Sequence, residues 1–211
     1  MIKLPIAVVL LTEIENGRKS FNDYITFEEK HFAWGSGTIK YKKKGTQIKI
    51  KDAFELMLSI SDNVAFNLIV DYLGGIGACN RRLAELGLHD TILIEYIKDF
   101  SGRNKVSSHD MVKSLELVFE ENKVNLTNQN YFRNILFKCS NRAFIKRVID
   151  SKYKFAHKTG TIGVALGDAG VIYLPWNKKI YISIIIKRPF DDEMARKLLH
   201  EVTRLTIEAL T

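Results

Sequence analysis

The chain has few cysteines and no spacing that suggests a metal site. Cys79 and Cys139 are the only two among 211 residues, and they form neither a metal-ligand pattern nor a disulfide framework. We expect both thiols to be free, although the sequence alone leaves a pairing between them open. The histidines also lack ligand spacing; they are His31, His89, His109, His157 and His200. The sequence therefore implies no metal ion and no organic cofactor.

Long hydrophobic runs are missing as well. The apolar stretch 2–11 contains Lys3 and Pro5, is too short to span a bilayer and lacks the small-residue cleavage site of a signal peptide. Taken literally, these features predict a cytoplasmic chain without a membrane span. The chain also lacks an internal repeat and a low-complexity linker.

Acidic residues are outnumbered, with 24 against 32 lysines and arginines, and the net charge is +8. Such a charge favours anionic partners such as nucleic acid, cell-wall polymers or small anions, without selecting among them. The lysine-rich stretch 40–51 is typical of a solvated loop, and no nucleic-acid recognition motif accompanies it. We therefore expect no nucleic acid, with a basic nucleic-acid-binding domain as the weakest alternative.

The order of predicted elements indicates an α+β fold in a single domain, 1–211. The helical part is expected at about 1–150, and an antiparallel sheet with a closing helix at about 151–211. Helices are predicted at 3–15, 50–58, 64–73, 76–86, 108–119, 130–137, 142–149 and 191–210. Strands are predicted at 153–158, 168–174 and 180–187, with a hairpin turn at 175–178. The polar stretch after residue 17 is expected to be loop.

Two tripeptides carry the chemical signal. Ser61-Asp62-Asn63 is followed 97 positions later by Lys158-Thr159-Gly160. S-D-N, K-T-G and S-x-x-K form one signature set of serine acyl-transfer enzymes. Lys3 is placed as the lysine of S-x-x-K, whose serine would stand one position before Met1. Read separately, these features have plainer explanations: a terminal lysine, a helix N-cap and the end of a strand.

With their flanking residues, these motifs resemble class A serine β-lactamases and the wider penicillin-recognising serine hydrolases. The resemblance rests on the segments 3–7, 35–39, 61–68, 157–161 and 168–170 and covers essentially the whole chain. It implies a β-lactamase/transpeptidase-like fold: a mostly helical lobe plus a small antiparallel sheet covered by a C-terminal helix. The family's first helix and first two strands are absent from this chain.

The resemblance also implies a role for each motif residue in amide cleavage through an acyl-enzyme. Lys3 would act as the base, and Ser61 would relay a proton to the leaving nitrogen with help from Lys158. Substrate binding would fall to Asn63, Lys158, Thr159, Gly160 and Thr161. Among these, Lys158 and Thr159 would bind the substrate carboxylate, and the Thr161 N–H would be an oxyanion donor.

The sequence departs from the family pattern in two places. The nucleophilic serine is absent, so the chain as written cannot form the acyl-enzyme. In the expected deacylation loop, 90–105, Glu95 is the candidate base, but the family's E-x-x-L-N pattern is missing. Without such a base an acylated protein would deacylate slowly, as a penicillin-binding protein does, rather than act as an efficient β-lactamase.

Three interpretations therefore remain open from the residues and the resemblance. The chain is a β-lactamase-like hydrolase, a penicillin-binding protein related to D-Ala-D-Ala peptidases, or an inactive relative that binds a carboxylate ligand. We expect Met1 to be an internal start or a truncated record, and the chain alone to be poorly soluble because its apolar strand 180–186 would have an open flank. By resemblance the partner would be a small-molecule substrate, a β-lactam or a D-Ala-D-Ala peptide, and the natural protein would act in the periplasm, at the cell surface or outside the cell. We expect a monomer.

Overall fold

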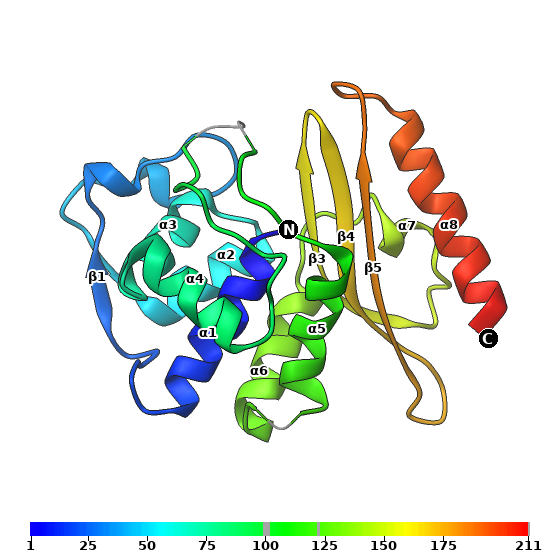
Figure 1. The fold of residues 1–211 in the computed structure, drawn as a ribbon, viewed down its shortest axis with the longest axis horizontal. Coiled ribbons are helices and arrows are strands. Elements are labelled where there is room, and N and C mark those ends of the chain that lie inside the picture. The colour runs from blue at the N-terminus through cyan, green and yellow to red at the C-terminus, as the bar shows by residue number, and fades with distance from the viewer. Residues whose placement is uncertain (99–101, 122, 211) are drawn as a thin grey trace.

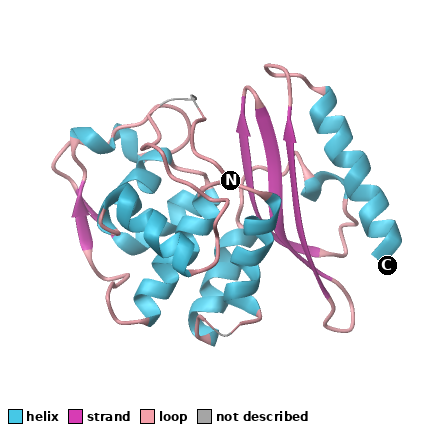
Figure 2. Ribbon diagram, in the orientation of Figure 1, coloured by secondary structure: helices cyan, strands magenta, loops and turns pink. Residues whose placement is uncertain are grey.

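A computed structural model describes residues 1–98, 102–121 and 123–210. A helical lobe stands on one side of a three-stranded sheet, and a C-terminal helix covers the sheet from the other side (Figure 1, Figure 2). The helices of the lobe are α1 (Lys3–Glu15), α2 (Ile50–Ser59), α3 (Asn63–Tyr72), α4 (Gly75–Glu85), α5 (Ser108–Phe119) and α6 (Leu126–Phe137). Among the described residues, no helix is both long and apolar enough to cross a membrane. The predicted α+β class is confirmed.

Helix α1 forms the centre of the lobe. Its residues from Lys3 to Glu13 are all buried, which explains why the segment is apolar on every face. Gly17, with a φ of +69°, follows the helix and turns the chain away, as the Asn16-Gly17 pair predicts. Lys3 lies in the first turn of this buried helix, so the core of the lobe fixes its position.

The main sheet consists of β3 (Lys154–Ile162), β4 (Ala165–Tyr173) and β5 (Lys179–Lys187), antiparallel and in that order. The turn between β4 and β5 places Trp176 and Asn177 at positive φ, as expected for a two-residue hairpin turn. Strand β3 forms the edge that faces the helical lobe. Within the described part of the chain, no strand pairs with the outer edge of β5.

Helix α8 (Met194–Leu210) packs on the far face of the sheet through Ala195, Leu199 and Thr203. A short helix, α7 (Ile145–Val148), lies beside it and completes a second, smaller hydrophobic core. The other face of α8 leaves Met194, Leu198 and Leu205 more than half exposed.

Several predicted boundaries are wrong. The expected loop after residue 17 contains a small ladder, β1 (Tyr24–Thr26) paired with β2 (Gln47–Lys49), and two short 3-10 helices, Glu29–His31 and Ile39–Tyr41. Helix α6 begins four residues before position 130 because the Asn125 side chain caps it. Only four residues of the predicted helix 142–149 are helical. Helix α8 begins at Met194, since Asp191 has a left-handed backbone that no helix accommodates.

Candidate active site

Lys3 and the Ser61-Asp62-Asn63 segment meet although they lie about 60 residues apart. The Lys3 ammonium donates to Asn63 Oδ1 at 2.6 Å and lies 3.0 Å from Ser61 Oγ, and it also donates to the Ser61 carbonyl. Lys3 is 5% exposed. The structure thus places two of the three predicted motifs in direct contact.

Asp62 provides the helix N-cap that the tripeptide suggested, and it also binds the loop at Thr38 and Ile39, which the sequence did not predict. Its carboxylate caps α3 by accepting the Ala65 N–H at 3.0 Å, and it accepts the N–H groups of Thr38 and Ile39 at 2.7 and 3.0 Å. Gly37 gives the carboxylate its room, because a Cβ there would lie 2.2 Å from Asp62 Cγ. Ser61 takes a φ of +59°, which presents its side chain toward Lys3.

The Lys158-Thr159-Gly160 motif lies within β3, near the N-terminus of the chain. Lys158 is 1% exposed, and its ammonium donates to the Thr159 carbonyl at 2.8 Å. Gly160 is needed for close approach, since a Cβ there would lie 2.3 Å from the backbone nitrogen of Met1. Thr161 is exposed and receives a hydrogen bond on its hydroxyl from Arg188.

Burial changes the protonation of both lysines. The pKa of Lys3 is well below its usual value, mainly because the amine is buried and further because the Lys158 charge is close; Asp62 opposes this. Burial also lowers the pKa of Lys158, while Asp168 and Cys139 act in the opposite direction. The Lys158 charge acts on Lys3, so the two amines lie near each other, and both burial and this charge favour the uncharged form of Lys3.

A buried pair supports β3 behind the site. His157 Nδ1 lies 2.8 Å from Asp168 Oδ1, and the other Asp168 oxygen accepts the Ile145 N–H at the start of α7. The Phe155 ring stacks on the His157 ring at 4.5 Å. His157 therefore packs and pairs beneath the site.

Cys139 lies beside the motif. Both cysteines are buried and free, and the Cys139 Sγ is 4.0 Å from the Thr159 hydroxyl.

Glu95 lies on the predicted loop, of which positions 99–101 are outside the described residues. Its carboxylate pairs with Arg103 at 3.1 Å, and its backbone is held by the Asn104 side chain. Its suggested role as deacylation base stays a prediction.

Asn67 attaches this loop to α3. Its side chain accepts the Ile97 N–H at 2.9 Å and donates to the Ile97 carbonyl at 2.7 Å and to the His31 carbonyl at 3.1 Å. An asparagine within the otherwise apolar run 64–70 was the available signal, because a buried amide must find partners. Asn67 is not among the site residues that the motifs predict.

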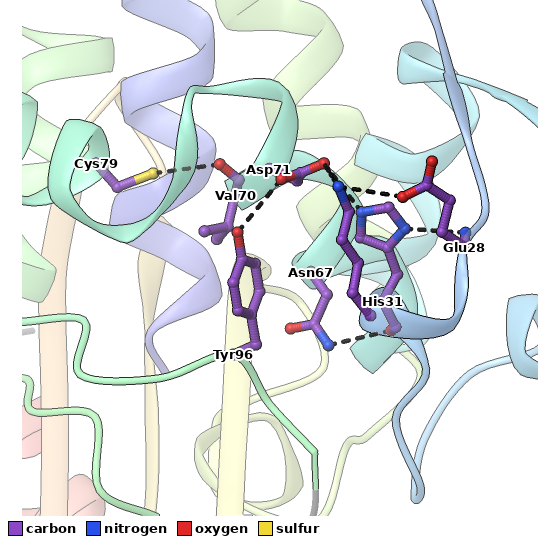
Figure 3. A network of polar contacts seen from close by, with 8 residues as sticks. Glu28, His31, Asn67, Val70, Asp71, Cys79 and Tyr96 are labelled. Atoms are coloured by element: carbon purple, nitrogen blue, oxygen red, sulfur yellow. Dashed lines mark hydrogen bonds and ion pairs between the residues drawn. The ribbon is translucent and has the colours of Figure 1, made fainter.

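A polar network continues from Asn67 toward the surface (Figure 3). The Glu28 N–H donates to His31 Nδ1, so Nε2 carries the proton and donates to Asp71 at 3.1 Å. The same carboxylate pairs with Lys30 and accepts the Tyr96 hydroxyl. This network fixes the loop of Tyr96 to the outside of α3.

One cluster brings metal-ligating atoms together among the described residues: Asp90, His109 and Asp110. The carboxylate of Asp110 is already used, because one oxygen accepts from the Asp90 N–H and the Thr91 hydroxyl and the other lies 3.2 Å from His109. The cluster therefore stabilises the start of α5 through hydrogen bonds.

A two-lobed α+β fold with these motifs at the junction defines the serine β-lactamase and penicillin-recognising class. Residues 1–210 match the β-lactamase enzyme family, so the chain belongs to that family. β-Lactamase VEB-1 of Pseudomonas aeruginosa is 24% identical over 98% of this chain and 75% of its own length. β-Lactamase BRO-1 of Moraxella catarrhalis is 26% identical over 90% of this chain and 63% of its own length.

Solved structures agree with this assignment. PBP-A superposes with a TM-score of 0.95 at 28% identity, covering 99% of this chain and 79% of that one. An ancestral class A β-lactamase superposes with a TM-score of 0.85 at 21% identity, covering 98% and 83%. The predicted resemblance to class A serine β-lactamases and the penicillin-recognising fold is confirmed.

Proposed function

We propose that this site recognises β-lactams and the D-Ala-D-Ala ends of cell-wall peptides, and that it supports acyl transfer when a serine precedes Met1. The observation that carries the proposal is the meeting of Lys3, Ser61 and Asn63 beside Lys158. The solved PBP-A structures support it, since one is described as an acyl-enzyme complex with penicillin G. Acting on cell-wall peptides would place the protein outside the cytoplasm.

The residues present suit the separate steps. Lys3, whose pKa is lowered by burial and by the Lys158 charge, would take the proton of a serine hydroxyl one helical turn before it. Ser61, 3.0 Å from the Lys3 amine, would pass a proton to the leaving nitrogen. Lys158 and Thr159 would bind the substrate carboxylate, and the Thr161 N–H would stabilise the oxyanion.

The deacylation step separates a β-lactamase from a penicillin-binding protein. Glu95 is the candidate carboxylate on the loop, and its pairing with Arg103 reduces its availability as a base. We therefore favour slow deacylation, with a long-lived acyl-enzyme. Efficient hydrolysis with Glu95 as base is the second candidate.

Recognition can be tested on the 211-residue chain itself. Calorimetric titration with benzylpenicillin should show binding to the unmodified chain and to Lys154→Met, but at least about tenfold weaker binding to Lys158→Met. Lys154 and Lys158 are both on β3, and each substitution removes one charge, but only Lys154 is exposed. Equal affinity of the two variants, or no binding to the unmodified chain, would refute the proposal.

Acyl transfer needs a second experiment. A chain carrying one added serine directly before Met1 should gain the mass of penicillin, whereas the unmodified chain should not. Persistence of the adduct for many minutes indicates the penicillin-binding protein, and rapid loss that Glu95→Gln slows indicates the β-lactamase. No adduct on the serine-extended chain would contradict the assignment of Lys3 as the base.

A further inference from the structure

The loop that follows β5 closes over the hairpin that joins β3 to β4. The Arg188 N–H donates to the Val164 carbonyl at 3.0 Å, and the Asp191 N–H donates to the Gly163 carbonyl at 2.8 Å. The Phe190 ring lies over Gly163, where an added Cβ would be 2.2 Å from a ring carbon. Asp191 holds a φ of +53°, a conformation that a non-glycine residue keeps only when its surroundings maintain it. The loop is therefore fastened to the hairpin.

The Arg188 side chain reaches further, along the end of β3. One guanidinium nitrogen, Nη2, donates to the Ile162 carbonyl at 3.2 Å and the Thr161 hydroxyl at 3.4 Å, and pairs with Asp191 at 2.9 Å. The other, Nη1, donates to the Asp192 carbonyl at 3.1 Å. The side chain is only 7% exposed. Such a rigid planar fork fixes several acceptors at once, which a lysine does not do.

The end of β3 that Arg188 contacts would open easily without this residue. Strand β3 is at the edge of the sheet and pairs only with β4 among the described strands. Thr161 lies one residue from the end of that strand, where local opening is easiest. An oxyanion donor must nevertheless be held within about 0.5 Å of its working position.

We propose that Arg188 is a positioning residue that fixes the Thr161 backbone N–H, with Phe190 over Gly163 as the second part of the same clamp. The inference rests on the proposed function, which assigns Thr161 its role as oxyanion donor. Arg188 acts through the Thr161–Ile162 segment and itself touches no reacting atom in this arrangement.

Backbone nitrogen-15 relaxation measured by NMR tests the clamp without any ligand, because it reports on a free N–H group as well as on a paired one. In Arg188→Ala, the order parameters of the Thr161 and Ile162 amides should fall from about 0.85 toward about 0.6, while those of the His157 and Asp168 amides stay unchanged. Arg196→Ala is the matched control, because it also removes one guanidinium but from an exposed ion pair with Glu193 near the start of α8. That control should leave all four amides unchanged.

Two further variants and a binding measurement complete the test. Arg188→Lys should recover only part of the rigidity, and Gly163→Ala should loosen the same two amides by displacing Phe190. Benzylpenicillin should bind Arg188→Ala about tenfold more weakly than Arg196→Ala. An unchanged order parameter at Thr161 in Arg188→Ala, or an equal fall along all of β3, would overturn the clamp. Absence of binding to the unmodified chain would instead overturn the proposed function, and the relaxation data would still decide on the clamp.

Discussion

Replacing Asp62 by alanine should destabilise the protein strongly. The fully buried carboxylate accepts three backbone N–H groups, from Thr38, Ile39 and Ala65. A hydrogen bond to a charged group contributes about 1.5–3 kcal/mol, and part of the total is offset by the cost of burying the charge. Since Asp62→Ala leaves three donors without their acceptor, we expect a loss of about 3–5 kcal/mol of unfolding free energy. That is a large share of the usual 5–15 kcal/mol.

Urea denaturation followed by circular dichroism measures this loss. The unfolding free energy of Asp62→Asn should lie between those of the unmodified protein and Asp62→Ala. The reason is that the single amide oxygen of asparagine can serve either the α3 cap or the two loop N–H groups. Asp52→Ala is the control: that aspartate lies exposed in the first turn of α2, so its replacement should lower the unfolding free energy by less than about 0.5 kcal/mol. If Asp62→Ala lowers the unfolding free energy by less than about 1 kcal/mol, the carboxylate does not stabilise this segment as argued.

Two further predictions concern stability. Glu13→Gln should cost about 2 kcal/mol at neutral pH, because the carboxylate pairs with Arg18 and Arg82. The hydrogen bond from Arg18 is the main cause of the lowered pKa of Glu13, so this contribution is present above the ordinary value of 4.5 and lost as the pH falls through the folded-state pKa. Denaturation curves of the two proteins should therefore converge in acid, and a constant difference would contradict the pairing. Gly170→Ala should cost about 2–3 kcal/mol, since its Cβ would lie 2.3 Å from the Ala156 carbonyl oxygen, whereas Gly77→Ala on α4 meets nothing within 4 Å and should stabilise by about 0.5–1 kcal/mol. Equal melting temperatures for these two glycine variants would show that the close approach at Gly170 is relieved by the backbone.

The sequence predicts best those elements whose environment is uniform along the chain. Helix α1 is recognisable because every side is buried, and its end is marked by Asn16-Gly17. The ladder of β1 and β2 is not, because each strand has three residues, too few for an alternating pattern to be distinguished from loop. Helix α8 shows its amphipathic pattern, yet its start depends on the left-handed backbone of Asp191, which is set by contacts with the β3–β4 hairpin.

Some parts of the candidate site can likewise be predicted from the sequence, and others cannot. Motif spacing identifies Lys3, Ser61 and Lys158, because their roles require particular side chains next to one another in the sequence. The supporting contacts join positions far apart along the chain: Thr38 to Asp62, Asn67 to Ile97 and Thr161 to Arg188. No local pattern encodes such pairs, so they follow only from the folded structure.

The charges of the site favour a ligand with a carboxylate. Lys3 and Lys158 bring two buried amines together. The nearby buried acids are already engaged: Asp62 accepts three backbone N–H groups, and Asp168 pairs with His157 and accepts the Ile145 N–H. They therefore offer little further compensation. Burying an unpaired ammonium group is costly, and a carboxylate placed at Lys158 would remove that cost. The same carboxylate would offset the Lys158 charge that lowers the Lys3 pKa, so a bound anion would raise the proton affinity of Lys3 at the step in which the proposed base must accept a proton. In the proposed mechanism, recognition of the anion and activation of the base are therefore coupled through the charge of Lys158.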